Sequence, residues 1–159
     1  MIQYITGDNY NPEHKTYYEQ IIPLTNTIKV SYPGYLDWLN NKFFYELKSN
    51  QKQRGYVFAL DRGLLVGLAL LKNYCMEKKL CCLFVKKGYR NHGIAKNLIK
   101  HSFDILKTKK PLVTISEQNI DMFLHLFQQF GFEITETRQD MYLKGIKEYY
   151  FNSVSQNKR

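Results

Sequence analysis

LCCLFVKKGYRNHGIA, residues 80–95, is the most informative segment of this 159-residue chain. Its first six residues are apolar and predict a buried strand. From Ile94 on, apolar residues recur at helical spacing, so the turn around Gly93 stands at the entrance to a helix. The first turn of a helix leaves about four backbone N–H groups free and carries a partial positive charge. The segment therefore predicts an anion site, and a pyrophosphate is the anion it suits best.

Apolar runs on both sides of this segment predict further strands. Residues 55–60 and 64–71 indicate two strands joined by a tight turn that contains Gly63. Residues 111–115 indicate another buried strand, and Asn119 begins a helical segment that ends at Phe130-Gly131-Phe132.

The two ends of the chain add to this pattern. Residues 2–6 predict a first strand, and Ser31 opens an amphipathic helix with Leu36, Leu39, Phe43 and Leu47 on its inner face. Residues 133–151 predict two last strands. The polar residues 152–159 are expected to fray.

Around residues 85–95 the sequence resembles the GNAT superfamily of acyl-CoA-dependent N-acetyltransferases. The central motif of that family is Arg/Gln-x-x-Gly-x-Gly/Ala, and Arg90, Gly93 and Ala95 occupy its positions. Val85 stands five residues before the arginine, where the family has a strand that ends in valine. The order of strands and helices from residue 55 to residue 135 agrees with the family.

The resemblance implies a fold and an activity. The expected fold is α/β (α+β), with a central, mixed but mostly antiparallel sheet of six to seven strands, splayed at the fourth and fifth strands and flanked by about four helices. The expected activity is transfer of an acetyl group from acetyl-CoA to a primary amine by direct attack. The alternative is a catalytically weak module of the same fold that binds acyl-CoA for regulation or interacts with RNA. A length of 159 residues fits a single domain over the whole chain.

The family also indicates which residues hold the cofactor. Main-chain groups near the end of the splayed strand bond the pantetheine and the thioester oxygen, and by position these belong to Leu83, Phe84 and Val85. The pyrophosphate is expected at the following N–H groups, with charge from Arg90: those of Asn91, His92, Gly93, Ile94 and Ala95. Asn119 stands near the place where the family often has an asparagine that contacts the cofactor.

Two positions, His92 and Phe127, bear on acid and base catalysis. His92 is interpreted as a solvent-side contact, since only its ordinary pKa near neutrality favours a role as base. Many family members carry a tyrosine four residues before the glycine of Gly-Phe, where its hydroxyl protonates the leaving sulfur. That position is Phe127 here, and a phenyl ring cannot donate a proton. Water or another tyrosine, such as Tyr142 or Tyr149, is left for this role.

The sequence also leaves the identity of the general base open. The position at which some relatives carry a carboxylate early in the fourth strand is Lys78 or Lys79, with Glu77 as the nearest acid. Glu117 follows the strand at residues 111–115 and is expected near the mouth of the cleft, either as the base or as a solvated surface acid. Removal of the amine proton through water is a further alternative.

The acceptor side is less defined by the sequence. In the family the first two helices and their connection cover this side, which makes Tyr32, Tyr35 and Trp38 candidate substrate-binding residues. The alternative is that these aromatics pack the helix onto the sheet. Small molecules, proteins and aminoacyl-tRNA all remain as acceptors, because such pockets are built from variable loops.

Composition narrows the class of protein. Hydrophobic residues at 44% and aromatic residues at 15% exclude a disordered chain. No segment approaches the roughly 20 apolar residues that a membrane helix needs, and residues 1–8 do not resemble a signal peptide, which indicates a cytoplasmic protein without membrane contact. Three cysteines without metal-ligand spacing predict no metal site and no disulfide, and Cys81 and Cys82 are expected to act as small core hydrophobes.

The net charge of +9 bears on partners. Several lysines lie around the predicted phosphate turn, where they can hold the phosphates of the cofactor or attract RNA, or can simply form a solvated face. The exposed late strands offer an edge for a homodimer.

Overall fold

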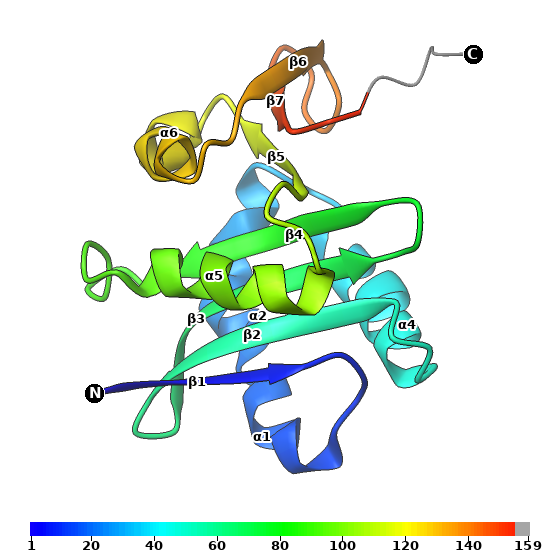
Figure 1. The fold of residues 1–159 in the computed structure, drawn as a ribbon, viewed down its shortest axis with the longest axis vertical. Helices are drawn as coiled ribbons and strands as arrows, with labels where there is room; N and C mark the ends of the chain where they lie inside the picture. Colours follow the sequence, from blue (N-terminus) through cyan, green and yellow to red (C-terminus); the bar gives the residue numbers. More distant parts are fainter. Residues whose placement is uncertain (155–159) are drawn as a thin grey trace.

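The computed structural model describes residues 1–154 and contains a seven-stranded sheet in the order β1-β2-β3-β4-β5-β7-β6 (Figure 1). The strands are β1 Ile2–Gly7, β2 Arg54–Asp61, β3 Leu64–Asn73, β4 Lys78–Val85, β5 Leu112–Ser116, β6 Ile134–Gln139 and β7 Lys147–Phe151. Every neighbouring pair is antiparallel except β4 and β5, which are parallel. The predicted mixed, mostly antiparallel α/β fold is confirmed.

Strands β4 and β5 are joined at one end only. Lys79 pairs with Leu112 and Leu80 with Val113, and within residues 1–154 no further pairing of β4 with β5 follows toward the end of β4. The predicted splay between the fourth and fifth strands is therefore present. Figure 1 shows the consequence, because β5, β6, β7 and α6 form a group set off from the sheet of β1 to β4.

Helices cover both faces of the β1–β4 sheet. Helix α5, Ile94–Leu106, lies across one face and buries Ile94, Leu98, Ile99 and Leu106 against β2 to β4 (Figure 1). The other face is covered by the N-terminal region. Its segments are η1 Pro12–His14, α1 Lys15–Tyr18, α2 Ile21–Thr25, η2 Asn26–Val30, α3 Tyr35–Trp38, η3 Leu39–Phe43 and α4 Phe44–Lys48. Helix α6, Ile120–Gln129, packs against β7 through Phe127.

The helix predicted to follow Ser31 contains one feature that its sequence pattern did not indicate. The segment η3 is a π turn, with a wider turn than an α-helix. As a result the buried positions fall at intervals of four residues, at Tyr35, Leu39, Phe43 and Leu47, and Leu36 is only partly buried. Tyr35 is thereby drawn into the core beside the sheet.

The C-terminal segment is held to the sheet up to Ser153. The Asn152 side chain donates to the Pro111 carbonyl oxygen, and the Ser153 N–H donates to the Thr135 hydroxyl. The remainder of the tail predicted to fray, residues 155–159, lies outside the described residues. Within residues 1–154, no helix combines the length and the apolar character needed to cross a membrane.

Candidate functional site

A cleft of about 1000 Å³ occupies the gap between the open ends of β4 and β5. One end is formed by the turn after β4 and the start of α5, including Gly93 and Ala95. The middle is walled by β4, β5 and α6, and the far end by the N-terminal helical region and Tyr142. The splayed sheet thus produces one continuous cleft that joins the predicted anion site to the predicted acceptor side.

The turn after β4 is built to present backbone N–H groups. Asn91 and Gly93 both have positive φ, at 66° and 80°, and Gly93 caps the N-terminus of α5. Within residues 1–154, none of the N–H groups from Asn91 to Ala95 has an acceptor. A Cβ placed on Gly93 would meet no atom within 4 Å, so this side of the turn is open space. The arrangement fits an anion such as a pyrophosphate at the helix N-terminus.

Arg90 ties this turn to the strand. Its Nε donates to the Val85 carbonyl oxygen at 2.9 Å, and its guanidinium carbon lies 5.8 Å from the centre of the Phe84 ring. The Arg90 side chain lines the cleft, whereas His92 does not. The structure therefore places eight of the nine predicted residues from Leu83 to Ala95 on the cleft; these are Leu83, Phe84, Val85, Arg90, Asn91, Gly93, Ile94 and Ala95.

The ladder between β3 and β4 decides which main-chain groups of β4 are free. The Lys86 N–H donates to the Val66 carbonyl oxygen at 2.7 Å. Because hydrogen-bonded pairs alternate along an antiparallel ladder, Phe84 also bonds to β3, opposite Leu68. The main-chain groups of Leu83 and Val85 then face the gap, and Phe84 contributes its side chain to the cleft.

The predicted acceptor residues lie together at the far end. Tyr32, Tyr35 and Trp38 all line the cleft. Tyr35 is also 94% buried and its hydroxyl lies 2.8 Å from that of Thr25, so it serves the core and the cleft at once. Asn119 lines the cleft as well, and its side chain donates to the Ser31 hydroxyl, at the start of the acceptor wall.

Glu148 is the residue that the sequence analysis missed. It is 2% exposed, and its carboxylate accepts a hydrogen bond of 2.7 Å from the Tyr32 hydroxyl. The Ser116 N–H donates to the same Tyr32 oxygen at 3.1 Å. Burial raises the pKa of the Glu148 carboxyl, although the hydrogen bond from Tyr32 opposes this. Successive residues of a strand point to opposite faces, and Glu148 shares the buried face of β7 with Tyr150. This alternation is the sequence signal that indicates a buried Glu148.

The remaining predicted residues differ in their placement. Tyr142 lines the cleft, and its ring stands edge-on to that of Tyr32 at 4.9 Å between centroids. Glu117 is exposed, does not line the cleft, and accepts a hydrogen bond from the Lys147 N–H. Phe127, a residue of α6, is fully buried in the core. Of the two cysteines expected in the core, Cys82 is buried and Cys81 is partly exposed.

Comparisons with known proteins agree with this geometry. The sequence matches the family model described as "Acetyltransferase (GNAT) domain" over residues 36–148. Among curated proteins no significant match to the sequence is found.

Solved structures share the fold at low sequence identity. A chain of the NatC complex bound to Gag peptide and CoA has a TM-score of 0.73 at 17% identity, with 94% of this chain and 96% of that chain covered. NAA60 from Arabidopsis thaliana in complex with acetyl-CoA has a TM-score of 0.67 at 18% identity, with coverage of 95% and 97%. PaiA N-acetyltransferase from Thermoplasma acidophilum in complex with coenzyme A has 0.63 at 21% identity, with coverage of 93% and 98%.

Proposed function

The chain belongs to the GNAT acetyltransferase family, and on this premise we propose that it transfers an acetyl group from acetyl-CoA to a primary amine by direct attack. The observation that carries the proposal is the cleft that runs without interruption from the exposed N–H groups after β4 to Tyr32. Acetyl-CoA is the cosubstrate because the turn offers a pyrophosphate site and the solved structures with this fold include complexes with acetyl-CoA and CoA.

Each part of the cofactor meets a different part of the cleft. The pyrophosphate lies against the N–H groups from Asn91 to Ala95, and Arg90 adds positive charge. The pantetheine runs along the open edge of β4, where the main-chain groups of Leu83 and Val85 are free. Asn119 stands on the opposite wall. The free main-chain groups of β4 polarise the thioester carbonyl. This lowers the barrier to attack, since these dipoles are already fixed and need no reorganisation during the reaction.

Tyr32 and Glu148 are the proposed route for the amine proton. The amine donates to the Tyr32 oxygen as it attacks, while the Tyr32 hydroxyl proton passes to the Glu148 carboxylate along the existing hydrogen bond. Because burial raises the pKa of its carboxyl, Glu148 is a stronger proton acceptor than an exposed acid. Glu148 takes this role in place of Glu117, whose carboxylate is bonded to the Lys147 backbone.

Tyr142 is the proposed acid for the leaving group. Its side chain lines the cleft, and burial raises the pKa of its hydroxyl, so it holds its proton at neutral pH. When the C–S bond breaks, the sulfur takes this proton and coenzyme A departs as the thiol. This step needs no donor at position 127.

The proposal is tested by calorimetric titration with acetyl-CoA and by release of free coenzyme A with a panel of amines. Gly93→Glu puts a carboxylate where the pyrophosphate lies and is expected to abolish binding. Gly63→Glu is the matched control, since Gly63 has φ of 84° and open space around it but lies outside the cleft. Binding without release for any amine supports the regulatory module instead, and no binding by the wild type refutes the proposal.

A further inference from the structure

Among the residues that the structure describes, none of those that line the cleft is acidic. Among the described residues 1–154, the charged side chains that line it are Lys79, Arg90 and Lys96. Arg90 and Lys96 stand at the phosphate turn. Lys79 lies six residues before Val85 on β4, about 20 Å along the strand, at the opposite end of the cleft. A cation at the acceptor end distinguishes this cleft from one built for substrates with several positive charges.

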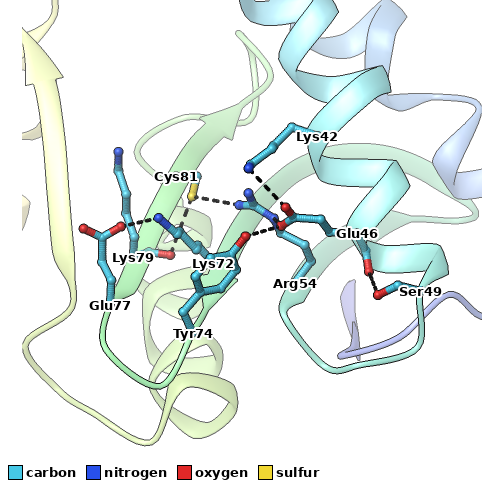
Figure 2. Close-up of polar contacts among 9 residues, drawn as sticks. All are labelled: Lys42, Glu46, Ser49, Arg54, Lys72, Tyr74, Glu77, Lys79 and Cys81. Atoms are coloured by element: carbon cyan, nitrogen blue, oxygen red, sulfur yellow. Dashed lines mark hydrogen bonds and ion pairs between the residues drawn. The ribbon is translucent and has the colours of Figure 1, made fainter.

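The Lys79 ammonium group has no counter-ion in residues 1–154. In Figure 2 its side chain extends away from Glu77, the nearest acid in the sequence, which is paired with Lys72 instead. Lys79 therefore remains available to a ligand.

A second positive charge lies directly behind the same wall. Arg54 is 2% exposed, and its Nη1 donates to the Cys81 sulfur at 3.7 Å (Figure 2). Cys81 lines the cleft, and burial raises the pKa of its thiol, so the thiol stays neutral. Glu46 pairs with Arg54 and also with the exposed Lys42, while the Nη1 end of the Arg54 guanidinium is turned toward Cys81 in the cleft wall. Water screens a buried charge poorly, so its field reaches into the cleft.

The opposite wall carries the complementary group. Tyr32 and the buried Glu148 are suited to receive an amine, and in the described part of the chain Lys79 and Glu148 form no ion pair with each other. Lys79 and Tyr32 both line the cleft, and Tyr32 bonds the Glu148 carboxylate, so the ammonium group and the Tyr32–Glu148 pair face one space. A ligand that carries both an amine and an anion can satisfy both walls at once.

Resting on the proposed function, we propose that the acceptor is a primary amine that also carries a free carboxylate, an amino-acid-like molecule whose amine meets Tyr32 and whose carboxylate meets Lys79. The amine nitrogen forms the new C–N bond, the C–S bond of the thioester breaks, and the amine proton leaves toward Glu148. The carboxylate stays intact and serves only for recognition. Polyamines are rejected, because their second ammonium group would face Lys79 and the field of Arg54. An aminoacyl ester on RNA is also disfavoured, since its carboxyl group is no longer charged.

The test uses matched acceptors. The common α-amino acids and β-alanine are compared with their methyl esters, with the corresponding decarboxylated amines and with 1,4-diaminobutane, and release of free coenzyme A is measured. A charge-assisted hydrogen bond is expected to favour at least one free acid over its ester by about tenfold or more in kcat/KM. The effect should lie mainly in KM, because the carboxylate does not react.

Two variants assign the preference to Lys79. Lys79→Met should remove the advantage of the acid over its ester, and Lys79→Glu should turn the preference toward the diamine. Lys72→Met is the control, because Lys72 is paired with Glu77 and does not line the cleft. Calorimetric binding of acetyl-CoA shows that each variant has folded.

The outcomes separate this inference from the proposed function. Absence of acetyl-CoA binding by the wild type contradicts the proposed function itself. Normal binding together with acetylation of esters or diamines as fast as acids, or with no acetylation of any acid in the set, overturns the substrate class. An unchanged preference in Lys79→Met overturns the role of Lys79.

Discussion

Replacing Phe127 by tyrosine tests where the leaving thiolate obtains its proton. Phe127 occupies the position at which many family members carry the acidic tyrosine. Its ring is fully buried, with centroids 5.8 Å from Phe123, 5.4 Å from Phe132 and 5.1 Å from Phe151. A hydroxyl added to this ring enters the aromatic core instead of the cleft. We therefore expect Phe127→Tyr to lower stability without raising kcat.

The size of the loss follows from this burial. A hydroxyl buried without a hydrogen-bond partner costs about 1–3 kcal/mol in proteins. For a chain of this length each kcal/mol lowers the melting temperature by roughly 2–4 °C, so a fall of about 2–12 °C is expected.

Thermal unfolding measures the melting temperature, and release of coenzyme A with a saturating amine measures kcat. Phe123→Tyr is the control, since Phe123 lies one turn earlier on α6, is partly exposed and lines the cleft. Its added hydroxyl reaches the cleft and should cost little stability. A Phe127→Tyr variant as stable as the wild type and with a higher kcat would refute the placement of Phe127 and return the acid to the position used by other family members.

Three further results are expected. Tyr142→Phe should lower kcat by about 10²-fold or more with little change in acetyl-CoA affinity, as loss of a general acid does, and an unchanged kcat would remove Tyr142 from the mechanism. Glu148→Gln should change stability in a pH-dependent way: the raised carboxyl pKa stabilises the fold fully below the ordinary glutamate pKa of about 4.3, and this contribution is lost as the pH rises through the folded-state pKa. The variant stays neutral, so its free energy of unfolding, measured with urea, should rise relative to that of the wild type as the pH rises. A constant difference would mean that Glu148 does not titrate abnormally. Arg54→Met should destabilise the protein by about 3–5 kcal/mol in urea unfolding, because it leaves the largely buried Glu46 with less compensation, and a loss below 1 kcal/mol would show that Arg54 is not essential to this network.

The sequence predicted those parts of the fold that depend on local patterns. The strands around Gly63 and the strand before Arg90 are continuous apolar runs, and helix α5 has a regular apolar stripe. The N–H groups after β4 could be assigned because a glycine at a helix entrance has the same geometry in any context. The splay was predicted only from the family resemblance, since no local pattern shows where two strands part, and the short pairing of β4 with β5 confirms it.

The acceptor end depends on contacts between distant parts of the chain, and the sequence could not show these. Tyr32 and Glu148 are 116 residues apart, and only the pairing of β5 with β7 brings Glu148 beneath Tyr32. The place of Glu117 after a strand predicts a position near the cleft. Its carboxylate instead accepts a hydrogen bond from the Lys147 backbone N–H, a contact that the sequence does not reveal. The π turn at η3 likewise reflects how the helix packs on the sheet and has no simple signature in the sequence.

The high net charge gains a more specific interpretation from its distribution. A net charge of +9 is compatible with binding of RNA, with binding of the cofactor phosphates or with a solvated surface. In the cleft, however, the positive groups fall into two separate sets, Arg90 and Lys96 at the turn and Lys79 at the far end, where the buried Arg54 lies behind the wall. The apolar side chains of Leu83 and Phe84 lie between them. A polyanion is bound best by positive charge that is continuous along its backbone. Two isolated sets suit two small anions instead, which are the pyrophosphate of the cofactor and a single carboxylate on the acceptor.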